Sequence, residues 1–172
     1  MLVCLGCGQS NPDGARFCMA CASLLPGAEP APHGARKTVT VVFCDVAGST
    51  MMAERLDPES VREVMSRFFR EMRSVLEFHG GTVEKFIGDA VMAVFGIPLL
   101  HEDDAIRAVR AAAGMRDALP PMSQDIQSRW GVELRARIGV NTGEVVVGDP
   151  AAGQALVVGD AVNVAARLEQ AA

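Results

Sequence analysis

Four of the five cysteines in this 172-residue chain lie within its first 21 residues. They form two pairs, Cys4-x2-Cys7 and Cys18-x2-Cys21. Each pair can make a tight knuckle, and two knuckles supply the four thiolates of a tetrahedral zinc site. The odd and clustered set argues against a disulfide framework, and redox cysteines are the alternative. The spacing therefore predicts one structural Zn²⁺ that folds a segment too short for a core of its own.

Two aspartates form the second candidate site. Asp45 follows the β-branched run from Thr38 to Cys44, and Asp89 lies in the dipeptide Gly88-Asp89 between two apolar segments. We expect both carboxylates to leave one sheet at turns, where they can hold two hard cations such as Mg²⁺ or Mn²⁺. Two such ions polarise a nucleophile and a leaving group together. Aspartate also favours turns for conformational reasons, so the residues alone leave both interpretations open.

Short apolar segments predict the strands that would carry these groups. We expect a buried strand at 38–44 and a hairpin of strands 82–87 and 90–95, with Asp89 at its tip. Two more strands are expected at 132–140 and 144–147, around an Asn-Thr-Gly turn.

Helical periodicity predicts three helices between and after these strands. The first runs from Asp57 to His79, with an N-cap, a proline and an early acid at its start. The second covers 102–118 and is expected to end at Pro120 and Pro121, and the third covers 159–171. This order predicts a ferredoxin-like α+β fold, a mainly antiparallel sheet with helices on one face.

Composition divides the chain into parts and excludes some functions. The segment 23–36 is rich in Ala, Pro and Gly and is typical of a linker between a zinc ribbon at 1–22 and a main domain at 37–172. Hydrophobic residues at 49% and charged residues at 22% suit a packed protein. A net charge of -5 disfavours nucleic-acid binding. With no apolar run of about 18 residues and no signal peptide, we expect a cytoplasmic protein without a membrane segment.

Three sequence motifs carry a family resemblance, which covers the chain from about residue 36 onward. FCDVAGST begins at Phe43, HGGTVEKFIGDAVMAVFG at His79 and VVGDAVNVAARLE at Val157. In this order they resemble the motifs of class III adenylate and guanylate cyclases, most closely those of the bacterial, soluble-cyclase-like branch. The resemblance implies the cyclase catalytic fold, preceded here by the zinc ribbon.

The resemblance also assigns roles at the metal and base sites. It implies that Asp45 and Asp89 bind two Mg²⁺ or Mn²⁺ ions, with help from the backbone carbonyl of Val46. Lys85 matches the lysine that reads adenine in such cyclases, a position where guanylate cyclases usually have an acid. A charged lysine in a strand can also be a solvated surface residue.

A helical pair completes the implied site. Asn163 and Arg167 lie four residues apart and so share one face of a helix. The resemblance makes Asn163 the residue that positions the ribose, and Arg167 the one that neutralises charge on the phosphates, which suits the planar guanidinium fork. In this family the two halves of the site come from different subunits, which implies a head-to-tail homodimer.

The chain departs from the family pattern in two places. The second purine-selecting position, normally Asp or Thr, is Leu156, which offers the base no polar contact. The phosphate-binding lysine and the closing strands of the family would lie beyond Ala172. We therefore expect a catalytic domain that is C-terminally truncated here, with a further C-terminal regulatory region in the longer protein.

These observations predict an adenylate cyclase that converts ATP into 3′,5′-cyclic AMP and pyrophosphate. The alternative is a catalytically weak or inactive nucleotide-binding regulatory module, which Leu156 favours. A zinc-ribbon nucleic-acid binder is a third hypothesis, disfavoured by the acidic charge and by aromatic residues at only 5%. A diguanylate cyclase shares the sheet plan, but its GGDEF-type signature is absent from the sequence.

Overall fold

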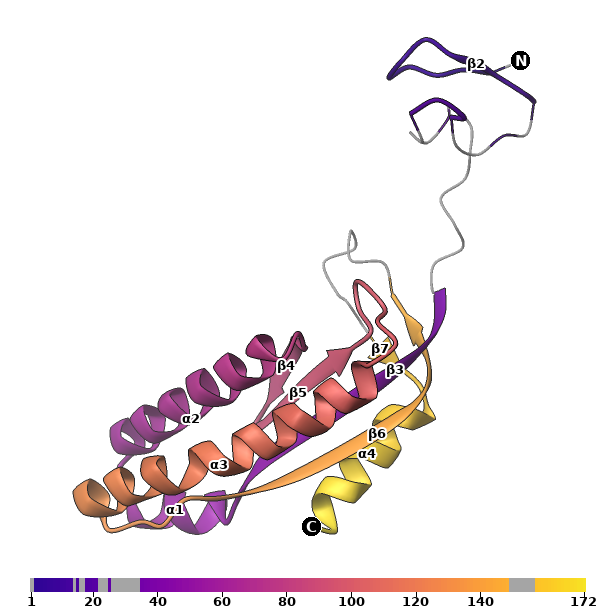
Figure 1. Ribbon diagram of the computed structural model, residues 1–172. Coiled ribbons are helices and arrows are strands. Elements are labelled where there is room, and N and C mark those ends of the chain that lie inside the picture. Colours follow the sequence, from indigo (N-terminus) through magenta and orange to yellow (C-terminus); the bar gives the residue numbers. More distant parts are fainter. Residues whose placement is uncertain (1, 14, 16–17, 22–24, 26–34, 149–156) are drawn as a thin grey trace. The chain divides into compact units, whose positions relative to one another are not determined.

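A computed structural model describes residues 2–13, 15, 18–21, 25, 35–148 and 157–172 (Figure 1). The chain forms two compact units, Met1–Ala35 and Arg36–Ala172. Most of the linker expected at 23–36 lies outside the described residues.

The first unit is built around a minimal hairpin. Strand β1 (Leu2–Val3) pairs antiparallel with β2 (Ser10–Asn11). Its buried apolar cluster consists of Cys4, Cys18 and Leu25. So small a cluster contributes little hydrophobic stabilisation, and the unit depends on its cysteines.

The second unit contains a five-stranded sheet. Its strands are β3 (Ala35–Ala47), β4 (Thr82–Ile87), β5 (Ala90–Phe95), β6 (Arg135–Val147) and β7 (Val157–Val158). Their spatial order is β4-β5-β3-β6-β7, and β5 runs antiparallel to both β3 and β4, as β7 does to β6. The β4–β5 hairpin has the predicted bounds, and the predicted α+β fold is confirmed.

Four helices accompany the sheet: α1 (Ser49–Arg55), α2 (Pro58–Phe78), α3 (Asp104–Trp130) and α4 (Asp160–Gln170). The predicted N-cap of α2 is present, since the Asp57 carboxylate accepts a backbone N–H of the first turn at 2.9 Å. The short helix α1 was not predicted. None of the described helices combines the length and apolarity that crossing a bilayer requires.

Strand β3 is buried on both faces because its side chains alternate between two layers. One set faces α2 and α3: Val42, Cys44 and Val46. The other set belongs to the layer that contains α4: Val39, Val41 and Phe43. The prediction that the helices share one face is therefore wrong, because α4 covers the opposite face of the sheet.

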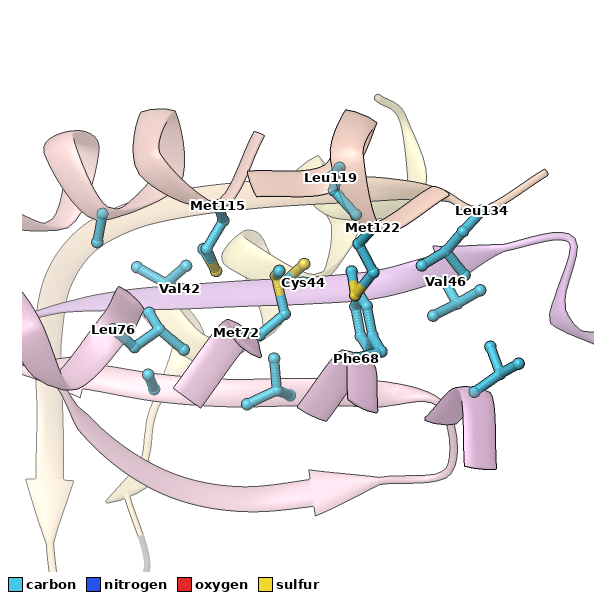
Figure 2. Packing of buried hydrophobic residues seen from close by; sticks show 14 of the residues in the cluster. Val42, Cys44, Val46, Phe68, Met72, Leu76, Met115, Leu119, Met122 and Leu134 are labelled. Atoms are coloured by element: carbon cyan, nitrogen blue, oxygen red, sulfur yellow. The ribbon is translucent and has the colours of Figure 1, made fainter. Parts of the chain in front are cut away.

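Figure 2 shows the larger of the two layers from close by. Side chains of β3 meet a row from α2 and a row from α3, and the two helices lie side by side over the sheet (Figure 1). The rows are Phe68, Met72 and Leu76 from α2 and Met115, Leu119 and Met122 from α3. Their spacing of three and four residues matches the helical period.

Helix α3 continues through Pro120 and Pro121, where the sequence predicted its end. Both prolines are solvent-exposed, whereas Leu119, Met122 and Ile126 are buried on the inner face. A proline inside a helix costs about 3 kcal/mol. Burying each large apolar side chain returns about 1.5–3 kcal/mol, so packing of the inner face outweighs the penalty.

Strand β6 is one continuous strand, so the turn expected at 141–143 is wrong. The polar and small residues there accommodate α4. The Asn141 amide donates a hydrogen bond to the Ala161 carbonyl at 3.0 Å, and Gly143 leaves room for the Ala161 side chain.

Strand β3 is also longer than predicted and passes through Asp45. Asp45 therefore lies within the sheet, opposite Ala90 of β5, and does not leave it at a turn. The β5 ladder continues to this position and holds the strand extended.

We predict that Gly139→Ala is far more destabilising than Gly143→Ala. A Cβ at residue 139 would lie 2.3 Å from the Ala165 carbonyl oxygen and 2.4 Å from the Glu169 backbone nitrogen, whereas one at residue 143 would meet only the Ala161 side chain, at 2.8 Å. We expect losses of about 3 kcal/mol or more and about 1 kcal/mol, respectively, in the free energy of unfolding measured in urea. Equal losses would contradict the close contact of α4 with β6.

Candidate active site

The fold brings Asp45 and Asp89 together. Asp45 is paired with Ala90, and Asp89 precedes Ala90 in the turn between β4 and β5. Burial raises the pKa of Asp45, and the neighbouring Asp89 carboxylate raises it further, against the opposing effect of Arg137. The two carboxylates therefore form an anionic site at one end of the sheet.

One oxygen of this pair has no partner among the described residues. The Asp45 side chain is only 15% exposed, and its Oδ1 is buried without a hydrogen-bond donor. Such an atom costs about 1–3 kcal/mol unless something satisfies it. A hard divalent cation is a suitable partner, because carboxylate and backbone carbonyl oxygens are the ligands it prefers. The carbonyl of Val46, the next residue of β3, was the third predicted ligand.

Two charged residues near Asp45 were missed in the sequence. Arg137 of β6 donates from Nη2 to Asp45 Oδ2 at 2.9 Å, and its Nε lies 3.1 Å from Oε1 of Glu169 in α4. The pKa of Glu169 is raised by burial and by the negative charge of Asp45. A signal for Glu169 existed, because it follows Ala161 and Ala165 at intervals of four on the buried side of the helix.

A β-bulge places Lys85 on the same sheet face as Asp45. Val83 pairs with Ala93 and Lys85 with Met92, which leaves Glu84 as the extra residue of the bulge. Met92 belongs to the α4 layer, so Lys85 opposite it lies on that face too. Two residues of a bulge oppose one partner residue, so Glu84 is brought beside Lys85.

Glu84 connects this bulge by a hydrogen bond to the residue that follows Leu156, the second purine-selecting position. Its Oε1 accepts the backbone N–H of Val157 at 3.2 Å, and its Oε2 is buried without a described partner. Leu156 itself lies outside the described residues. The strand of Lys85 and the start of β7 are therefore in contact, although they are distant in sequence.

Asn163 and Arg167 lie on the solvent side of α4. The buried side of this helix consists of Ala161, Ala165 and Glu169, and at 3.6 residues per turn positions 163 and 167 fall on the opposite side. The Arg167 side chain is 70% exposed, and its nearest described acidic group is Asp160, at 3.8 Å. Within one chain these two side chains are thus turned away from Asp45.

In the first unit the four cysteine sulfurs converge. Their Sγ atoms all lie within 4.8 Å of one another, and the pairs Cys4–Cys21 and Cys7–Cys18 are each 3.5 Å apart. Zn–S bonds of about 2.3 Å place the sulfurs of a tetrahedral site about 3.8 Å apart, so the cluster is of the right size to hold a metal ion. No disulfide joins these cysteines.

Backbone and side-chain hydrogen bonds support the cysteine cluster. The backbone N–H groups of Cys21 and Ala20 donate to Cys18 and lower its pKa to about 6, which favours the thiolate that binds metal. The buried Asn11 side chain accepts the N–H of Met19 at 2.9 Å and so links the two knuckles. This role of Asn11 was not predicted.

Comparison with known protein families matches residues 32–172 to the adenylate and guanylate cyclase catalytic domain. The chain belongs to this family. The resemblance identified in the three motifs is therefore confirmed, and the second unit is a class III cyclase domain.

Relatives and solved structures agree with this assignment. The chain is 34% identical over 137 residues to adenylate cyclase 1 of Rhizobium meliloti and 32% identical over 152 residues to an adenylate cyclase of Anabaena cylindrica. These alignments cover 78% and 83% of this chain but only 21% and 29% of the relatives. The chain thus spans less than a third of the length of these curated relatives.

Two solved structures share the fold equally well. The guanylyl cyclase Cya2 is 37% identical and the adenylyl cyclase CyaB from P. aeruginosa is 34% identical, each with a TM-score of 0.76. They cover 81% and 80% of this chain, which in turn covers 72% and 74% of theirs. One of these proteins is a guanylyl cyclase and the other is an adenylyl cyclase, so the fold alone does not determine which purine base is bound.

Proposed function

We propose that this domain is an adenylate cyclase that converts ATP into 3′,5′-cyclic AMP and pyrophosphate. The observation that carries the proposal is the adjacent pair Asp45 and Asp89, with one buried carboxylate oxygen free of described donors. Bound there, two Mg²⁺ or Mn²⁺ ions would supply Lewis-acid polarisation of the 3′-hydroxyl and of the phosphates. Asp45, Asp89 and the Val46 carbonyl would hold them.

The reaction is an internal displacement at the α-phosphorus. The ribose 3′-oxygen loses its proton and forms a bond to the α-phosphorus, while the bond from that phosphorus to the bridging oxygen of pyrophosphate breaks. Asn163 orients the ribose so that the 3′-oxygen faces the phosphorus. Arg167 holds phosphate oxygens through its planar fork and offsets the negative charge that builds on them.

The position of Lys85 supports adenine as the base. It lies on the sheet face that also carries Asp45, where its ammonium can donate to a ring nitrogen of adenine. Leu156 provides no polar contact, so the base selection that we propose depends on Lys85. A cytoplasmic location follows from this proposal, because ATP and reduced thiols are both typical of that compartment.

The outward direction of Asn163 and Arg167 supports a head-to-tail homodimer. These side chains are exposed on α4, whereas Asp45 is enclosed between β6, α4 and the β4–β5 turn. A second copy with the opposite orientation would supply its Asn163 and Arg167 to the aspartates of the first. Two equivalent sites result from such an isologous pair.

We expect a version of the protein that extends past residue 172 to form cyclic AMP from ATP with Mn²⁺. Asp45→Ala should lower this rate at least about a hundredfold, because it removes a carboxylate that binds the cations. Without the cations, the negative charge of the transition state is less stabilised. Asp117→Ala is the matched control, since Asp117 pairs only with the exposed Arg116 among the described residues. Nucleotide binding by calorimetry without any cyclic AMP would instead support the regulatory-module alternative.

A mixing experiment tests the shared sites. Asp45→Ala and Arg167→Ala are each expected to be inactive alone. An equal mixture of the two should regain about a quarter of wild-type activity, because half of the dimers pair one chain of each and keep one intact site of two. A mixture no more active than its separate components would contradict sites built from two chains.

We also propose that the four-cysteine cluster binds one structural Zn²⁺. Four thiolates leave no open coordination position, so the ion would stabilise the fold of the ribbon and take no part in the chemistry. We expect one zinc per chain by atomic emission, lost in Cys18→Ser. Cys44→Ser should retain the zinc, because Cys44 lies buried in the cyclase domain. Zinc retained by Cys18→Ser would contradict this site.

A further inference from the structure

Arg137 is shared between two carboxylates on different elements. From β6 it reaches Asp45 of β3 at 2.9 Å and Glu169 of α4 at 3.1 Å. The Asp45 and Glu169 side chains are 15% and 7% exposed, while that of Arg137 is 34% exposed. One guanidinium therefore neutralises two enclosed anions, one of which is a proposed metal ligand.

The two contacts differ in kind. Arg137 Nη2 makes a hydrogen bond to Asp45, whereas Arg137 Nε and Glu169 Oε1 are close but lack hydrogen-bond alignment. Glu169 is thus a second anion near the guanidinium whose hydrogen-bonding capacity is not fully used. A modest side-chain rotation can exchange one carboxylate for the other.

We propose that Glu169 is a positioning residue for metal loading: it takes the Arg137 guanidinium from Asp45 when divalent cations bind there. The inference rests on the proposed function, in which Asp45 is a metal ligand. A cation and a guanidinium compete for the same carboxylate, and a displaced Arg137 needs another anion in this enclosed place. Glu169 already lies within reach, so the exchange needs no movement of the backbone.

A purely structural role for Glu169 would be to fasten the end of α4 to β6. That contact is made by the backbone, because residue 139 has no side chain and the Glu169 nitrogen packs against it. A second rival is that the negative charge of Glu169 attracts cations directly. Both rivals act without Arg137, whereas the proposed exchange acts through it.

A double-mutant cycle separates these roles. We would measure Mn²⁺ binding to the nucleotide-free protein by the electron paramagnetic resonance of free Mn²⁺, for Glu169→Gln, Arg137→Gln and the double variant. Glu169→Gln should weaken binding about tenfold, and Arg137→Gln should strengthen it, because the competitor is gone. In the Arg137→Gln background, Glu169→Gln should then change binding less than about twofold. Arg135→Gln is the matched control, since Arg135 lies on the same strand but pairs with the exposed Glu133.

Each remaining outcome counts against the proposal. If Glu169→Gln weakens Mn²⁺ binding equally in the wild-type and Arg137→Gln backgrounds, Glu169 acts by attracting the cation directly. If Glu169→Gln leaves binding to the otherwise wild-type protein unchanged, the exchange is overturned. Thermal unfolding of every variant checks its fold, and Glu169→Asp, which keeps the charge, should restore most of the binding. If Asp45→Ala binds Mn²⁺ as tightly as the wild-type protein does, the metal site of the proposed function would instead be overturned.

Discussion

The burial of β3 on both faces is the constraint on which the rest of the cyclase domain depends. Side chains of α2 and α3 cover one face and those of α4 cover the other, so the apolar residues of this strand from Val39 to Val46 all face a packed layer. Asp45 occupies one of these enclosed positions. Because an isolated carboxylate cannot remain ionised there without compensation, a cation must lie beside it, and Arg137 provides that charge in the chain itself.

The close approach of α4 to β6 follows from the same layered plan and divides the site. Gly139 and Gly143 let the helix backbone and the Ala161 methyl group lie directly on the strand. This contact fixes the rotation of α4 about its axis, with Glu169 turned inward and Asn163 and Arg167 turned outward. Asn163 and Arg167 are therefore turned away from the aspartates of their own chain, and the geometry of this helix supports the proposed dimer.

Local patterns predicted the elements that depend on local interactions. The β4–β5 hairpin and α2 follow from a Gly-Asp turn and from an N-cap with a regular apolar stripe, and both were predicted closely. The end of α3 and the continuity of β6 were wrong because packing against other layers overrode Pro120, Pro121 and Gly143. The bulge at Glu84 could not be predicted, because it is a local shift of register within a hairpin whose apolar pattern gives no sign of it. The pairing of Arg137 with Asp45 could not be predicted either, because it joins strands far apart in sequence.

The buried charges of the site are better explained by binding than by stability. Replacing a buried ion cluster with apolar side chains of similar volume is often neutral or stabilising, so stability alone gives no reason to keep Asp45, Arg137 and Glu169. The cluster also leaves Asp45 Oδ1 and Glu169 Oε1 without hydrogen-bond donors among the described residues. Incoming cations can satisfy these unused carboxylate oxygens, and their binding would then stabilise the folded state. The same incomplete satisfaction is consistent with the proposed change of partner, because Arg137 Nε and Glu169 Oε1 are both left without a hydrogen-bond partner among the described residues.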